Sequence, residues 1–274
     1  MRNMRRFAVT VILCAAALVS GQAPEHTASI ALRSRLQPFK GSPDWQEVAF
    51  DRPIEFQRTA LVLCDMWDHH WCKGAESRVG ILAEKMAPIV EQLRAHGVLI
   101  IHAPSETMQF YTEHPARLAM LKIPQVELPR ELDLTAPPLP IDDSDGGCDT
   151  GEVAHMPESR VWTRENSRLR IAPGDLVSDK GQEVYSALCQ RGIHDLLLAG
   201  VHANMCVLNR GFAIKQMSKW GVRCILIRDL TDAMYNPKRP PNVSHAQGTE
   251  LVIEHIEKYW APTTTSHELL KAMK

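Results

Sequence analysis

Short aliphatic runs alternate along the chain with segments whose apolar residues recur every three or four positions. The run "TALVLCDM" (59–66) is typical of a buried strand, and residues 77–97 carry apolar side chains at helical spacing that ends at Gly97. Similar patterns predict strands at 98–104, 159–165, 194–201 and 222–229, and helices at 181–192, 203–220 and 244–260. Strand and helix in repetition predict an α/β fold, a doubly wound, mainly parallel sheet with helices on both faces in a three-layer sandwich.

The same pattern predicts the organisation of the chain around one α/β domain. Residues 58–260 form the predicted domain, preceded by a polar arm at 22–57 and followed by a loosely attached tail at 261–274. A stretch dense in proline, glycine and aspartate at 122–158 interrupts the alternation and predicts a long irregular insertion.

The first 21 residues have the layout of a secretory signal peptide. Three arginines precede an apolar run, and the run ends in small residues at Gly21. Cleavage there would leave a periplasmic or secreted protein with no stable membrane span, because the uncharged run is short for a span. An uncleaved N-terminal anchor is the alternative.

Charge narrows the class of partner. The chain has 31 basic and 32 acidic residues, a formal net charge of −1, and therefore no basic surface of the kind that binds nucleic acid. The glycine motifs of nucleotide-binding loops are also absent from the sequence. A small-molecule substrate is the partner that remains.

Cys206 is the most informative residue of the stretch "GVHANMCVLN", which follows a predicted strand and opens a predicted helix. Backbone N–H groups at a helix start have no partner within the helix, so they favour a thiolate and can bind an oxyanion. The alternative is that Cys206 is a small buried apolar residue. Asp65 ends the first strand of the domain, and a carboxylate there could accept the proton of the thiol.

Cysteine pairing stays open at this level. Six of the seven cysteines follow the leader, and an even number in an exported protein permits disulfides. Cys64 and Cys224, however, lie inside strand-like runs where lone buried thiols are common.

Together, "LVLCDMW", "LLLAGVHANMCVLNRGFAIKQM" and "VRCILIRDLTDAMYNP" resemble the isochorismatase-like cysteine hydrolase superfamily, which includes nicotinamidases and carbamoylases. The resemblance covers residues 58–260 and implies a catalytic aspartate, lysine and cysteine. Asp65 and Cys206 match the first and last of these. The resemblance also implies a cis peptide bond between Val201 and His202, which turns the backbone N–H of His202 toward the oxyanion beside that of Cys206.

The lysine of the resemblance has no clear counterpart. Arg164, in "VWTRENSRLRI", occupies the corresponding place at the end of a predicted strand, and Lys180 is the nearest lysine before the next helix. We prefer Arg164, which could hold Asp65 and the thiolate by its charge but does not readily move a proton.

A pocket for the substrate is expected where the strands end. Trp67, His70, His102 and Tyr235 follow or end strands of the domain and are the candidate substrate-binding residues. His70, His102 and His202 could also converge on a divalent metal. Because the compact aspartate-x-histidine motif of nicotinamidases is missing and each histidine alone is usually structural, we assign no metal ligands.

These observations predict an exported cysteine hydrolase that cleaves a C–N bond of a small amide or carbamoyl compound through a covalent acyl-enzyme. The alternative is a small-molecule binding or scaffolding protein of the same fold, in which loss of the lysine has removed turnover. Relatives often associate, which suggests a homo-oligomer.

Overall fold

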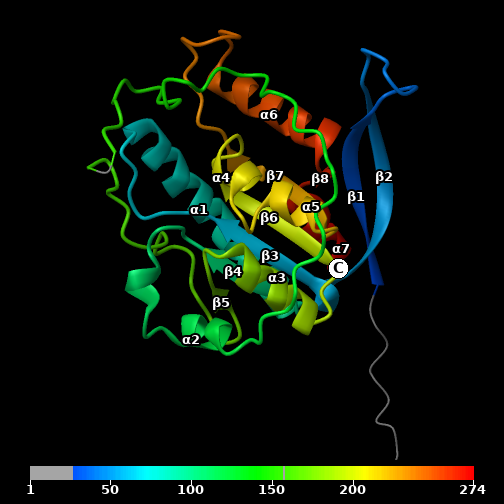
Figure 1. The fold of residues 1–274 in the computed structure, drawn as a ribbon, viewed down its shortest axis with the longest axis vertical. Helices are drawn as coiled ribbons and strands as arrows, with labels where there is room; N and C mark the ends of the chain where they lie inside the picture. Colours follow the sequence, from blue (N-terminus) through cyan, green and yellow to red (C-terminus); the bar gives the residue numbers. More distant parts are fainter. Residues whose placement is uncertain (1–26, 157) are drawn as a thin grey trace, which may run out of the picture.

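The fold is known from a computed structural model that describes residues 27–156 and 158–274. Its centre is an eight-stranded sheet with the order β2-β1-β8-β7-β6-β3-β4-β5 (Figure 1). The strands from β8 to β5 are parallel to one another, and β1 and β2 are antiparallel at one edge. The strands are β1 (Thr27–Leu36), β2 (Gln46–Glu55), β3 (Thr59–Cys64), β4 (Leu99–Ala103), β5 (Leu176–Val177), β6 (Asp195–Val201), β7 (Arg223–Asp232) and β8 (Thr263–Thr264).

Helices cover both faces of this sheet, so the predicted fold class is confirmed. Side chains alternate along β3: Leu61 and Leu63 face α1 and α7, whereas Val62 and Cys64 face the opposite core. Each face therefore has its own apolar core. The helices are α1 (Lys73–Ala95), α2 (Pro115–Leu121), α3 (Gly181–Gln190), α4 (Cys206–Asn209), α5 (Ile214–Lys219), α6 (His245–Tyr259) and α7 (Ser266–Ala272), with 3-10 turns at Phe56–Arg58 and Met108–Tyr111.

Both terminal segments belong to the sheet, which corrects two expectations. The described part of the predicted arm is the β1–β2 hairpin, in which Ile30 and Leu32 are buried while the other strand is largely exposed. The predicted tail contributes β8, which lies between β1 and β7, and α7, whose Leu269 is fully buried. A two-residue strand is too short to leave a periodic pattern.

Two internal predictions also change. Residues 159–165 form no strand; one bridge between Trp67 and Glu165 is the only sheet-like pairing there, and the short β5 pairs with β4 instead. Residues 203–220 form two short helices, α4 and α5, rather than one. The insertion at 122–158 has no helix or strand among its described residues.

The predicted leader, 1–21, lies outside the described residues. Among the residues that are described, no helix combines the length and the apolar content that a membrane span requires.

Candidate active site

The site forms where β3 and β6 end side by side. Cys64, the last residue of β3, pairs with Gly200 of β6, so Asp65 and Val201 follow at the same edge of the sheet. A side chain at Gly200 would meet the carbonyl oxygen of Cys64 at 2.1 Å, which explains why glycine stands there. The peptide bond between Val201 and His202 is cis, as the resemblance implies. Cys206 then opens α4.

Asp65 and Cys206 are in contact despite their separation in the sequence. Asp65 is fully buried and has a left-handed φ of 48°, and its Oδ1 accepts a hydrogen bond of 2.7 Å from the backbone N–H of Ser105. Burial raises the pKa of Asp65, and hydrogen bonding by the Cys206 side chain lowers it, so the sulfur acts on the same carboxylate. The strand-end rule thus placed a carboxylate and a sulfur correctly at one rim.

The surroundings of Cys206 favour a neutral thiol, which differs from our expectation of a thiolate. Burial is the main cause that raises the pKa of Cys206 well above its ordinary value, and the charge of Asp65 raises it further. Because α4 has only four residues, its partial charge is too small to reverse these effects. A neutral thiol beside Asp65 can give its proton to that carboxylate.

The cation beside Asp65 is Arg210, not Arg164 or Lys180. Arg210 Nε lies 3.0 Å from Asp65 Oδ2. Burial raises the pKa of Asp65, and the charge of Arg210 lowers it in part. The side chain of Arg164 is 50% exposed, lies 3.8 Å from Asp68 and packs over Phe110. The side chain of Lys180 is 65% exposed and pairs with Asp179.

Sequence spacing could have identified Arg210. It stands four residues after Cys206, and positions i and i+4 share one face of a helical turn. Its backbone N–H bonds to the carbonyl oxygen of Cys206, so the turn brings the guanidinium back toward the sulfur and Asp65.

His202 contributes through its backbone and its ring. Burial raises the pKa of the Cys206 thiol, and hydrogen bonding by the backbone of His202 lowers it. Its imidazole is buried, has a pKa lowered to about 3 by burial, and leaves Nε2 without a hydrogen-bond partner among the described residues. Binding of an oxyanion by the N–H groups of His202 and Cys206 stays a prediction.

A small cavity of about 220 Å³ lies beside Cys206. Two of the candidate substrate-binding residues, Trp67 and His70, line it. The ring of Trp67 stacks on that of Trp162, with 4.5 Å between the ring centroids. Burial lowers the pKa of His70 to about 4, and its Nδ1 accepts a hydrogen bond from the N–H of Cys72, so its Nε2 carries the proton. The cavity lining consists of Trp67, His70, Trp71, Glu106, Gly146, Met156, Arg160, Trp162, His202, Met205, Cys206, Arg210 and Met234.

His102 and Tyr235 do not line this cavity, which corrects their predicted role. His102 is fully buried in β4, where its ring bonds to Glu165 at 2.6 Å and Asp175 at 3.2 Å. Burial opposes its charge, but the two carboxylates raise its pKa to about 9. Tyr235 is fully buried and its hydroxyl donates to the carbonyl oxygen of Arg239.

The three histidines do not fit a shared metal. The ring of His102 is held between Glu165 and Asp175, and His70 uses Nδ1 for the N–H of Cys72 while its Nε2 is protonated. Among the described residues, one cluster of potential ligands is compact enough, and it consists of Glu152 with two cysteines that form a disulfide.

That disulfide joins Cys72, at the start of α1, to Cys148 in the insertion. Nearby, Trp71 and Gly146 line the cavity, and a side chain at Gly147 would meet the carbonyl oxygen of Met234 at 2.3 Å. The covalent link therefore holds the insertion against the site. The described cysteines without a disulfide are Cys64, Cys189, Cys206 and Cys224.

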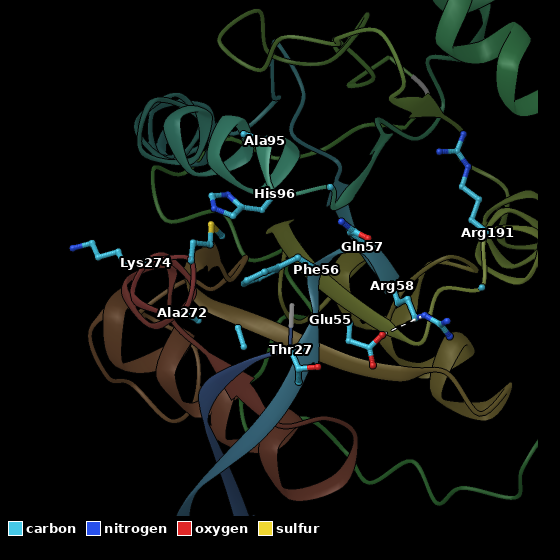
Figure 2. Close-up of a pocket in the computed structure, with 14 residues that line it drawn as sticks. Thr27, Glu55, Phe56, Gln57, Arg58, Ala95, His96, Arg191, Ala272 and Lys274 are labelled. Atoms are coloured by element: carbon cyan, nitrogen blue, oxygen red, sulfur yellow. Dashed lines mark ion pairs between the residues drawn. The ribbon is translucent and has the colours of Figure 1, made fainter. Parts of the chain in front are cut away.

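A larger cavity, of about 810 Å³, lies at the other end of the strands (Figure 2). It adjoins the start of β3 and the ends of α1 and α7, and the ion pair of Glu55 with Arg58 lies within it. None of the described cysteines or aspartates lines it, so the described lining offers no counterpart of Cys206 and Asp65.

Comparison with solved structures finds similar folds. A cysteine hydrolase from Pseudomonas syringae pv. phaseolicola 1448A is 16% identical, with a TM-score of 0.49 over 81% of this chain and 95% of its own. An isochorismatase from Pseudomonas putida KT2440 is 14% identical, with a TM-score of 0.48 over 79% and 92%. No protein-family model matches the chain, and no curated protein matches it.

Proposed function

We propose that this protein is a cysteine hydrolase of the isochorismatase-like type that cleaves a C–N bond of a small amide or carbamoyl compound. One observation carries the proposal: half-buried Cys206 lies beside the buried carboxylate of Asp65, which is paired with Arg210, and Cys206 lines a cavity. A thiol, a base and a cation in this order are the parts that nucleophilic acyl transfer requires.

In the first half of the reaction, Asp65 takes the thiol proton while the Cys206 sulfur bonds to the substrate carbonyl carbon. The N–H groups of His202 and Cys206 bind the oxyanion that forms. Asp65 then gives its proton to the leaving nitrogen, the C–N bond breaks, and an amine or ammonia departs. A thioester on Cys206 remains.

In the second half, water attacks the thioester and loses a proton to Asp65, and the carbon–sulfur bond breaks. The acid product leaves, and the proton returns to the sulfur. Burial lowers the pKa of Arg210, but the charges of Asp65 and Cys206 raise it more. Arg210 therefore stays protonated throughout. It stabilises the carboxylate and the developing thiolate by charge alone.

The test is release of ammonia from acetamide, benzamide and N-carbamoylglycine, with Cys206→Ala as the control variant. Intact mass measured during turnover should show an acyl adduct that Cys206→Ala lacks. Turnover by Cys206→Ala equal to that of the wild type would contradict the proposal. Tight binding of these amides to the folded wild type without an adduct or product would favour the binding protein, in which an arginine replaces the proton-moving lysine.

We also propose export to the periplasm or the medium. The leader-like pattern of residues 1–21 and the Cys72–Cys148 disulfide support it, since such bonds persist in oxidising compartments. Fractionation of cells that express the full chain should find the protein outside the cytoplasm, and deletion of residues 2–21 should retain it inside. Equal distribution of both forms would contradict export.

A further inference from the structure

Among residues 27–156 and 158–274, three charged side chains line the cavity, and all three are paired. Glu106 Oε1 lies 3.5 Å from Arg210 Nη1, and Glu106 Oε2 lies 3.3 Å from Arg160 Nε. One carboxylate thus bridges two arginines that come from different parts of the chain. Arg160 follows the insertion, and Arg210 follows the turn that begins at Cys206.

The backbone fixes the position of this carboxylate. Glu106 directly follows Ser105, whose N–H holds Asp65, and it has a left-handed φ of 66°. Its own N–H donates to Asp179 at 3.1 Å. Glu106 is therefore attached to the same segment that orients the base.

The charges around the sulfur cancel. Arg160 and Arg210 supply two positive charges, and Glu106 and Asp65 supply two negative ones. The remaining lining side chains are tryptophan, methionine, cysteine and two neutral histidines. An anionic substrate consequently finds no unpaired arginine, and it would have to displace Glu106 to gain one.

We propose that Glu106 is a specificity-determining residue that selects neutral substrates over anionic ones by neutralising Arg160 and Arg210 at the mouth of the cavity. The inference builds on the proposed function in taking Cys206 as the reacting atom. Removal of the Glu106 charge would leave a net positive mouth that favours carboxylate-bearing compounds. Removal of the Arg160 charge would leave a net negative mouth that disfavours them further.

Two alkylating reagents test this without any turnover. Iodoacetamide is neutral and iodoacetate is anionic, and in both the thiolate sulfur displaces iodide from the same type of carbon. The ratio of their rate constants at Cys206 therefore cancels changes in the thiolate fraction. The measurement uses full-length protein with Cys189→Ser, which removes the exposed free thiol, at one mildly alkaline pH.

The amide-to-acetate ratio should fall about fivefold or more in Glu106→Gln and rise in Arg160→Gln, since one unit charge changes close to the reacting carbon. Glu113→Gln, an exposed charge outside the cavity, should leave the ratio unchanged and serves as the matched control. The opposite shifts of the two variants separate a charge effect from partial unfolding.

A ratio within about twofold of the parent in both variants, or a shift of both in the same direction, would overturn the inference and leave the proposed function standing. Failure of Cys206 to react with either reagent in every variant would overturn the proposed function and this inference together.

Discussion

Two buried clusters of charge lie at neighbouring strands and have different consequences. At the end of β3, Asp65 pairs with Arg210; in β4, His102 pairs with Glu165 and Asp175. Asp65 and His102 were both candidate site residues in the sequence, because each lies at or near the end of a predicted strand. Only the first adjoins a cavity and a nucleophile, whereas the second is sealed. A buried charged residue therefore indicates a candidate site only where a reactive side chain and a cavity lie beside it. Elsewhere it stabilises the fold.

Asp65→Asn should cause the largest loss of turnover. It removes the proton acceptor of Cys206, and we expect turnover to fall about 10³-fold or more, in the range reported for lost catalytic bases. Steady-state ammonia release measures it. An identical loss of turnover in His102→Gln at equal folded fraction would show that the two clusters do not differ as argued.

His102→Gln should act on stability instead. It leaves buried Glu165 without its cation, while Asp175 keeps its pair with Arg94, and we expect a loss of about 3–5 kcal/mol in the free energy of unfolding, measured with urea. Turnover per folded molecule should change little. Loss of turnover with unchanged stability would place His102 in the reaction and contradict its assignment to the fold.

The pH dependence of stability follows from the same histidine. Its pKa is raised to about 9 in the folded state, above its ordinary value of 6.5. Its contribution is therefore complete below about pH 6.5 and is lost as the pH rises through about 9. Wild-type stability should decline across this range, and His102→Gln should lack that decline. Parallel curves for the two proteins would exclude a buried imidazolium.

Loss of the Cys72–Cys148 disulfide should affect stability and substrate binding more than the chemical step. Replacing Cys72 and Cys148 by serine should lower stability by about 2–4 kcal/mol, as for a bond that closes a long loop. Because the insertion supports the cavity wall, KM should rise more than kcat falls. A fall in kcat alone would contradict this division.

Arg210→Gln should lower turnover about 100-fold, less than Asp65→Asn, because the guanidinium supplies charge but moves no proton. Arg164→Gln is the matched control and should retain turnover within about twofold, because its partner is Asp68. If Arg164→Gln were the more damaging of the two, the placement of the cation would be wrong.

The sequence allowed the parallel sheet to be predicted because aliphatic runs such as that of β3 are buried on both faces. It also allowed Asp65 and Cys206 to be placed together, since parallel strands end at one edge. The hairpin of β1 and β2 could not be predicted, because β2 is a largely exposed edge strand whose polar and apolar residues do not alternate. Burial of Ile30 and Leu32 becomes evident only in the fold.

The remaining errors concern side chains whose partners come from irregular segments. His102 is enclosed by Glu165 and Asp175. Glu165 ends a segment that was predicted as a strand and forms none, and Asp175 lies just before the two-residue β5. Arg210 was missed for another reason. We sought a cation at the end of a third strand, by resemblance, whereas the helical turn after Cys206 already supplied one.

The state of the Cys206 thiol tests the central contact most directly. Its titration can be followed by the ultraviolet absorbance of the thiolate, as the difference between Cys189→Ser and Cys189→Ser/Cys206→Ala. We predict a pKa above the ordinary value of 9.0 in the parent and a lower one when Asp65→Asn is added, because burial and the aspartate charge both oppose the thiolate. A thiolate at neutral pH, or a pKa indifferent to Asp65→Asn, would contradict the pairing of this sulfur with this carboxylate.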